Sequence, residues 1–151
     1  MEEAEKTMMT PTYWTGQPIQ PGDWVRVYSS RFGVWHHGIV RNLFLVADGI
    51  GVEIIHNMKD TGVSLSDWYE FAAGNLIHLH GRPSSPEHAL EIVRRAEANT
   101  GNSYGLFDQN CEHFCSFCYT LKAESESLQV LGWMAVGTAV VIGLTASNRQ
   151  Q

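Results

Sequence analysis

Alternating apolar and polar residues dominate the first half of the chain and predict β-strands. Four such runs are bounded by Gly, Pro, Ser or Asp residues, which favour turns. They cover residues 24–28, 36–46, 52–56 and 76–80. The second and third runs are joined by a turn at Asp48-Gly49, so they predict a hairpin.

Apolar side chains at three- and four-residue spacing predict helices further along the chain. A short helix over residues 67–73 would be capped by Ser66. A longer one over residues 86–100 begins with a proline and is stopped by Gly101. Because the strands and helices do not follow a βαβ order, they predict an α+β domain whose antiparallel sheet packs on helices.

The stretch 110–114, Asn-Cys-Glu-His-Phe, places a thiol in the first turn of a last helix. Asn110 is a suitable N-cap, and the buried stripe of this helix would be Phe114, Phe117, Cys118 and Leu121. Free amides and the helix dipole favour an anion at Cys111, so we expect its pKa to fall below the ~8.5 of a free thiol. A buried structural cysteine is the alternative interpretation.

A cysteine nucleophile needs a base, and the base needs a group that orients its ring. His36 and His37 are adjacent on a strand and so face opposite sides, and His56 could lie beside His36 on the next strand. Spacing alone does not choose between His36 and His37. The other histidines are expected elsewhere: His78 and His80 on the sheet surface, His88 in solvent, and His113 about 200° around the helix from Cys111.

All three cysteines of the 151-residue chain lie between positions 111 and 118, which is not the pattern of a disulfide framework. We therefore expect a reducing compartment. Cys111, Cys115 and Cys118 also fit the spacing of the [4Fe–4S] ligands of radical S-adenosylmethionine enzymes. That motif needs a long barrel after it, whereas only residues 119–151 follow here, so we favour ordinary packing. We expect no metal and no organic cofactor.

The length and net charge of the chain limit the number of domains and the kinds of partner that we expect. The chain has room for one domain and an appendage, and its net charge of -6 argues against a nucleic-acid partner. Residues 1–20 are polar and contain prolines, so we expect a flexible lead-in, and their acidic start does not resemble a signal peptide.

Residues 128–146 contain no charged side chain. As a helix they would be ~28 Å long, close to the ~30 Å core of a bilayer, so they predict a single-pass C-terminal membrane anchor. A buried core helix is the alternative. Small residues at four-residue spacing, Ala135, Ala139 and Gly143, would allow helix-mediated self-association. We expect the domain itself on the cytoplasmic side.

Several short motifs resemble the lecithin retinol acyltransferase family, including its phospholipase/acyltransferase branch and its bacterial members. In chain order they are Pro21-Gly22-Asp23, His36-His37-Gly38-Ile39, Ile54-Ile55-His56, Tyr104-Gly105-Leu106 and the specific block at 110–114. The resemblance implies a catalytic domain over residues 21–123 with a circularly permuted papain-like fold. It also implies that Cys111 is the nucleophile, His36 the general base and His56 the residue that orients His36.

The resemblance implies a thiol-dependent acyl hydrolase or acyltransferase of the phospholipase A1/A2 type. A phospholipid would donate its acyl group to Cys111 as a thioester, and water, an amine or a hydroxyl would accept it. Residues 42–51 look inserted relative to lipid-acting members, so the hairpin tip is expected to reshape the substrate entrance. The alternatives are a papain-like cysteine amidase or peptidase, and a non-catalytic, membrane-tethered interaction module. The residues that bind substrate are unknown.

Overall fold

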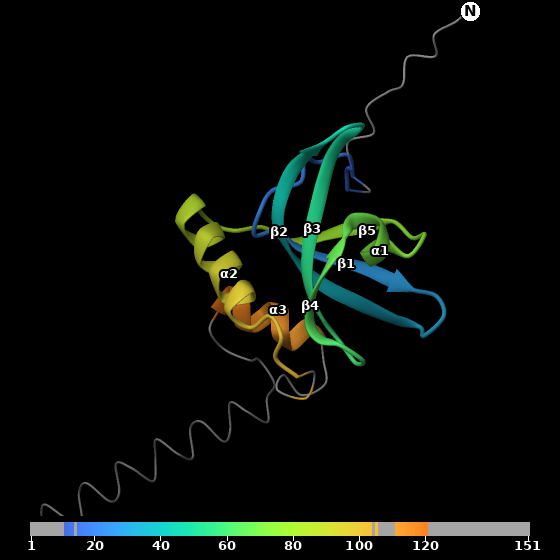
Figure 1. Cartoon of the computed structure of the whole chain (residues 1–151), viewed down its shortest axis with the longest axis vertical. Helices are drawn as coiled ribbons and strands as arrows, with labels where there is room; N and C mark the ends of the chain where they lie inside the picture. Colours follow the sequence, from blue (N-terminus) through green and yellow to red (C-terminus); the bar gives the residue numbers. More distant parts are fainter. Residues whose placement is uncertain (1–10, 14, 104, 106–110, 121–151) are drawn as a thin grey trace, which may run out of the picture.

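The computed structural model describes residues 11–13, 15–103, 105 and 111–120, which form an α+β domain (Figure 1). Its five strands make one antiparallel sheet in the order β4-β3-β2-β1-β5. The strands are β1 (Trp24–Ser29), β2 (Val34–Val46), β3 (Gly49–Met58), β4 (Gly62–Asp67) and β5 (Ile77–Gly81). The helices are α1 (Trp68–Ala72), α2 (Pro86–Ala98) and α3 (Cys111–Thr120). The predicted class and the antiparallel sheet are confirmed.

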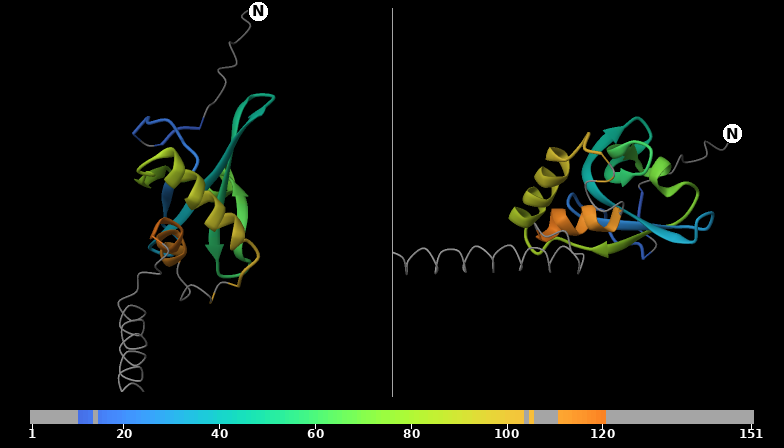
Figure 2. Two further views of the ribbon diagram at one scale, coloured as in Figure 1. Left: turned by 90° about the vertical axis from the view of Figure 1, so that its left-hand side faces the viewer. Right: turned by 90° about the horizontal axis from the view of Figure 1, so that it is seen from below.

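The sheet separates two apolar cores, because neighbouring residues of a strand point to opposite faces. On one face Val40 and Ile54 pack with α1 and with residues that precede β1. On the other face Ile39 and Ile55 pack with α2 and α3. Figure 2 shows α2 and α3 lying together on one side of the sheet. The active-site candidates on β2 and β3 are therefore held by strands that are packed on both faces, and α3 packs on one of these faces.

Strand β4 was not expected from the sequence. It pairs with β3 from Met58↔Gly62 to Glu53↔Asp67, so it forms an edge of the sheet. The expected cap of α1 is also wrong by one residue. Asp67 is the N-cap, since its side chain accepts the amide hydrogens of Tyr69 and Glu70, and the Glu70 carboxylate accepts the Asp67 amide in return. Ser66 instead remains in the strand and is free to make a contact in the sheet.

The chain before β1 contributes to the core. Tyr13 is 2% exposed and Ile19 is 8% exposed, and both pack on the face that α1 covers. The packed chain thus begins ahead of Pro21, the boundary expected from the sequence.

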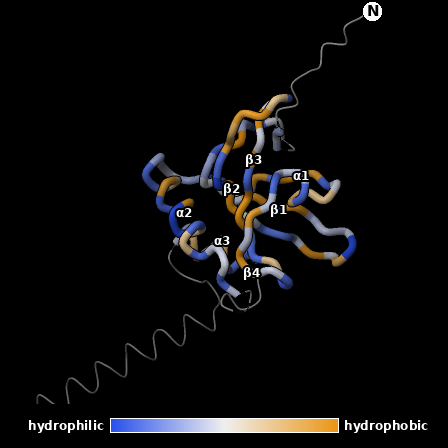
Figure 3. Tube along the Cα trace, in the orientation of Figure 1, coloured by the Kyte–Doolittle hydropathy of each residue, from blue (hydrophilic) through white to orange (hydrophobic). Residues whose placement is uncertain are grey.

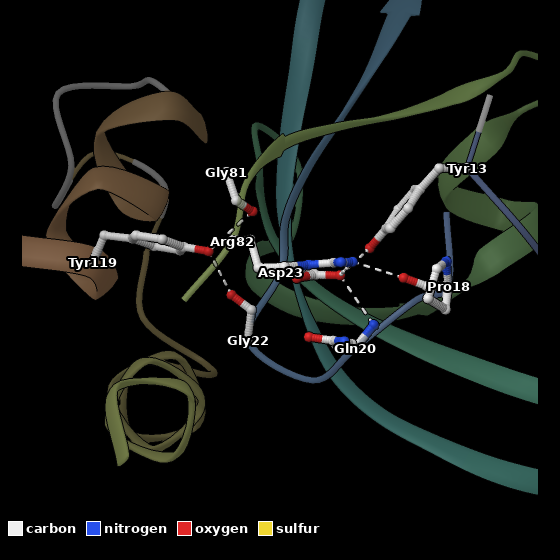
Figure 4. Close-up of polar contacts among 8 residues, drawn as sticks. All are labelled: Tyr13, Pro18, Gln20, Gly22, Asp23, Gly81, Arg82 and Tyr119. Atoms are coloured by element: carbon white, nitrogen blue, oxygen red, sulfur yellow. Dashed lines mark hydrogen bonds and ion pairs between the residues drawn. The ribbon is translucent and has the colours of Figure 1, made fainter. Parts of the chain in front are cut away.

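A buried carboxylate ties this segment to the sheet (Figure 4). Asp23, which is fully buried, accepts hydrogen bonds from the Tyr13 hydroxyl at 2.7 Å and the Gln20 amide at 3.0 Å. Arg82 donates to it twice, each time at 2.9 Å, and also binds the Pro18 carbonyl. Burial and the bond to Asp23 raise the pKa of Tyr13, so this hydroxyl stays a donor. The paired hydrogen bonds from Arg82 compensate the buried negative charge of Asp23, and a neutral side chain would not form this ion pair.

The Pro21-Gly22-Asp23 motif has a steric basis at its glycine. Gly22 has φ +87, which favours glycine. A Cβ there would lie 2.9 Å from Pro83 Cγ and 3.0 Å from Ala89 Cα. The absence of a side chain therefore lets β1 begin directly beneath α2. The Tyr119 hydroxyl of α3 reaches the same turn and lies 2.7 Å from the Gly22 carbonyl and 3.2 Å from the Gly81 carbonyl (Figure 4).

The expected membrane anchor over residues 128–146, with its small-residue stripe, lies outside the described residues. Among the helices that are described, none has the length and apolar character needed to cross a bilayer.

Replacing Asp23 by Asn should lower the free energy of unfolding by about 2–3 kcal/mol, because Arg82 loses its charged partner and one buried acceptor becomes a donor. Urea unfolding followed by circular dichroism measures the change. Arg94→Met is the matched control, since it removes the exposed ion pair with Glu91 and should have little effect. Equal losses in the two variants would contradict the role given to Asp23.

Candidate active site

Cys111 lies where β2 and β3 part. All of β1 pairs with the beginning of β2, but the pairing of β2 with β3 stops at Gly38↔His56. On the side that faces β3, the backbone of residues 34–37 is therefore not paired with another strand. The first residue of α3 lies there: Cys111 Sγ accepts the His37 amide hydrogen at 3.3 Å and lies 3.8 Å from the Trp35 carbonyl. The helix start is thus joined to the backbone on both sides of His36.

The Cys111 thiol is half-buried, and this burial is the main influence on its pKa. The His37 amide donates to the sulfur, and this amide together with those of Cys111 and Glu112 favours the thiolate and lowers the pKa. Burial is nevertheless the larger effect, and it raises the pKa of the Cys111 thiol above its usual value. The expectation of a lowered pKa is therefore wrong, because it considered the helix start and not the loss of solvent around it.

Two histidine rings meet beside the thiol's strand. His36 Nε2 lies 2.7 Å from His56 Nδ1, and His56 Nε2 lies 2.7 Å from the hydroxyl of Ser66 on β4. His36 Nδ1 has no hydrogen-bond partner among the described residues, and no hydrogen bond there joins this ring to Cys111. A neutral imidazole has one donor and one acceptor nitrogen. If His36 Nδ1 keeps its lone pair, the bonds run in one direction, from His36 to His56 to Ser66.

Phe71 forms the apolar wall of this pair. Its ring centroid lies 5.2 Å from that of His36 and 5.4 Å from that of His56. Gly38 makes this approach possible, since a Cβ there would lie 2.9 Å from the Phe71 ring and 2.6 Å from Ile54 Cγ2. The glycine of the His-His-Gly-Ile motif therefore brings α1 against the two imidazoles.

Burial keeps both rings uncharged. It lowers the pKa of His36 below the usual 6.5. It also lowers the pKa of His56 to about 3, and repulsion from His36 adds to the effect. Burial therefore disfavours the charged forms of the thiol and of both imidazoles.

His37 takes no part in this chain of rings. Its ring lies on the other face of β2, where Nδ1 accepts the Trp24 indole N–H at 2.8 Å. Burial, followed by the charges of His80 and Arg26, lowers the pKa of His37 to about 4. The structure thereby distinguishes two neighbours that spacing could not: the His36 ring meets His56, and the His37 backbone meets Cys111.

The other candidates have structural contacts. His78 and His80 lie on β5 at the sheet surface, as expected. His88 is not simply solvated, because it contacts Ser84 and the Tyr119 carbonyl. Cys115 and Cys118 are free thiols buried in the core with Phe114. Within the described chain, no three His, Cys, Asp or Glu side chains are grouped so as to hold a metal ion.

The inserted hairpin does not reach the site. From Gly38↔His56 its strands run about eight residues to Val46↔Gly49, or about 26 Å at ~3.3 Å per residue. Figure 3 shows that this far end is hydrophobic, and Phe44, Leu45 and Val46 are exposed there. The expectation that the tip reshapes the substrate entrance is therefore not met at Cys111.

Sequence reasoning missed two neighbours of the histidines, Ser66 and Phe71. Ser66 was assigned to a helix cap because β4 was overlooked. Phe71 belongs to the expected helix, and its contact with the rings depends on the empty space at Gly38. A glycine directly after two histidines in a strand is the signal that points to such a close approach.

Residues 17–124 match the family described as Lecithin retinol acyltransferase. The chain belongs to this family. Membership indicates an enzyme of the acyltransferase or phospholipase type that acts on lipid acyl substrates. The chain has no significant match among curated proteins.

Phe71→Ala should let water reach both rings and raise the pKa values of His36 and His56 toward 6.5, because desolvation is the main cause of their lowering. It should also reduce the free energy of unfolding by about 3–4 kcal/mol. Proton NMR titration of the histidine rings measures the pKa values. Phe71→Leu keeps the site apolar and is the control in which they stay low. Unchanged values in the alanine variant would show that Phe71 does not exclude water.

Proposed function

We propose that this protein is a thiol-dependent acyl hydrolase or acyltransferase that cleaves phospholipid esters through an acyl thioester on Cys111. The main support is that the Cys111 sulfur bonds the amide next to His36 while the His36 ring bonds His56 at 2.7 Å. In this proposal Cys111 is the nucleophile, His36 the base and His56 the residue that orients His36, and these contacts support the assignment. The family match supports the lipid acyl substrate.

In the first step His36 Nδ1 takes the proton of the Cys111 thiol while the sulfur attacks the ester carbonyl carbon. Because the pair is neutral at rest, charge separates only as the bond forms. The imidazolium donates its Nε2 hydrogen to His56 Nδ1, which favours the cation. The low pKa of His56 keeps that ring neutral, so it orients His36 and does not take its proton.

Collapse of the tetrahedral intermediate completes acylation. The carbon–oxygen bond breaks, and the imidazolium gives its proton to the leaving lysophospholipid oxygen. Backbone amides at the start of α3 and at His37 surround the sulfur, and they are the donors available to the oxyanion. Such donors each contribute ~10²–10³ in rate. Water, an amine or a hydroxyl then gives a proton to His36 and attacks the thioester carbonyl; the carbon–sulfur bond breaks, and the imidazolium returns the proton to the Cys111 sulfur.

The proposal also includes the fold type, the membrane anchor and the pairing of anchors. The two histidines precede the cysteine, in the order of a circularly permuted papain-like fold. Residues 128–146 would anchor the domain on the cytoplasmic side of a membrane, so that the site works near its lipid at high effective concentration. The stripe of Ala135, Ala139 and Gly143 would pair two such anchors.

Incubation with a short-chain phosphatidylcholine should add one acyl group to the full-length protein and release fatty acid. Both effects should be lost in Cys111→Ala, because the sulfur that forms the thioester is gone. Intact-protein mass spectrometry and fatty-acid analysis measure them. Cys115→Ala is the control, since it changes a buried thiol on the same helix and should keep both.

Two results would contradict the proposed reaction. Fatty acid release that persists in Cys111→Ala would exclude the thioester mechanism. Turnover of peptide amides without turnover of phosphatidylcholine would identify a cysteine amidase instead.

The pH dependence should show a base with a low pKa. Activity requires neutral His36, and burial lowers the pKa of this ring, so the neutral form persists below pH 6.5. The acid limb of kcat/KM should therefore have its midpoint below 6.5, and activity should be nearly constant across neutral pH. A pH–rate profile on a soluble ester provides the test. A midpoint above 6.5 would contradict the neutral pair.

A further inference from the structure

One end of the sheet exposes an aromatic and basic surface directly beside the thiol. It belongs to the hairpin that joins β1 to β2, and we call it the hairpin patch. Its residues are Arg26, Tyr28, Arg31, Phe32 and Trp35. Phe32 is 70% exposed, Tyr28 44% and Trp35 37%. The backbone of the patch reaches the active site, because the Trp35 carbonyl lies 3.8 Å from Cys111 Sγ, while the Trp35 side chain lies on the face of β2 opposite to the His36 ring.

The side chains of the patch pack on one another instead of on a core. The Tyr28 and Trp35 ring centroids are 5.3 Å apart, and the Arg26 guanidinium lies 4.3 Å from the Trp35 ring centroid. The Arg31 guanidinium lies 5.2 Å from the Phe32 ring centroid. The turn is held by the Gly33 amide, which donates to the Ser29 carbonyl at 2.8 Å. The exposed aromatic side chains of the patch therefore lie on a hairpin whose turn is closed by a backbone hydrogen bond.

The charge of this surface differs from that of the rest of the domain. The chain has a net charge of -6, yet no Asp or Glu occurs from residue 24 to residue 47. Arg41, Arg82, Arg94 and Arg95 each form an ion pair. In the described part of the chain neither Arg26 nor Arg31 has a carboxylate partner, and Arg26 Nε is buried without a hydrogen bond. Arg31, which is exposed at the turn, is therefore available to an external anion, and Arg26 adds positive charge behind the Trp35 ring.

We infer that the hairpin patch docks on the surface of an anionic phospholipid bilayer and holds Cys111 at the level of the lipid ester bonds. Trp and Tyr side chains favour the interface between lipid and water, and Arg can lay its apolar stem on lipid while its head binds phosphate. The ester bonds lie just below the headgroups, where a thiol at the base of the patch would meet them. The inference takes its substrate from the proposed function, but the docking surface can be tested without catalysis.

The binding test uses full-length protein that carries Cys111→Ala, with one new cysteine labelled with an environment-sensitive fluorophore. The label is placed at Phe32→Cys or, as the control, at Leu45→Cys. Leu45 is 85% exposed and lies at the opposite end of β2. The probes are phosphatidylcholine vesicles with and without phosphatidylglycerol. A blue shift at position 32 that is stronger with phosphatidylglycerol, with no shift at position 45, is the expected result.

The kinetic test compares two substrates. Phe32→Asp should lower turnover of vesicle phospholipid at least tenfold and leave turnover of a soluble short-chain ester within twofold. Arg31→Glu should reduce vesicle turnover about fivefold or more when phosphatidylglycerol is present, and less without it. Leu45→Asp is the control that should change neither.

The results separate the two proposals. A label at position 32 that remains in water on vesicles, or a shift confined to position 45, would overturn the docking surface. If the label at position 32 remains in water on vesicles, the hairpin patch would instead be a binding surface for a protein partner. If the wild-type protein cleaves no ester while position 32 still enters the bilayer, the docking surface stands and the proposed chemistry fails.

Discussion

The parting of β2 and β3 beyond the Gly38↔His56 pair is the constraint on which the site depends. Up to that pair the register brings the ring of His56 to His36, and beyond it the open side of β2 receives the start of α3. A slip of one residue in this register would turn the His56 side chain to the other face of the sheet. The two cores, packed on opposite faces, oppose such a slip because Ile54 and Ile55 would exchange environments.

The uncharged state of the site follows from what surrounds it. Phe71 covers the rings, and no carboxylate bonds either of them among the described residues. Burial opposes both the thiolate and the imidazolium here. The same apolar surroundings suit a lipid substrate, which would remove the remaining water on arrival and strengthen every polar contact within the site.

Sequence reasoning predicted most of the elements because their patterns are strong. The strands around Val25, Ile39 and Ile54 alternate, and the helix beginning at Pro86 has a clear start signal. It missed β4, since a six-residue strand with serines among its residues looks like a turn. That omission hid the role of Ser66 as a contact of His56.

The candidate site was predictable in part. Resemblance suggested His36 over His37, but alternation alone shows only that two neighbours face opposite ways and not which face holds the thiol. The pKa of Cys111 was not predictable, because burial depends on how the helix meets the sheet.

The hydroxyl of Tyr119, near the carboxyl end of α3, lies within reach of the Gly22 and Gly81 carbonyls. It fastens the helix to the beginning of β1 and the end of β5, at the end opposite to Cys111. A pull on the chain beyond Thr120 would therefore load this fastening before it could displace the sulfur. These contacts would help to separate Cys111 from forces that act on the chain beyond Thr120.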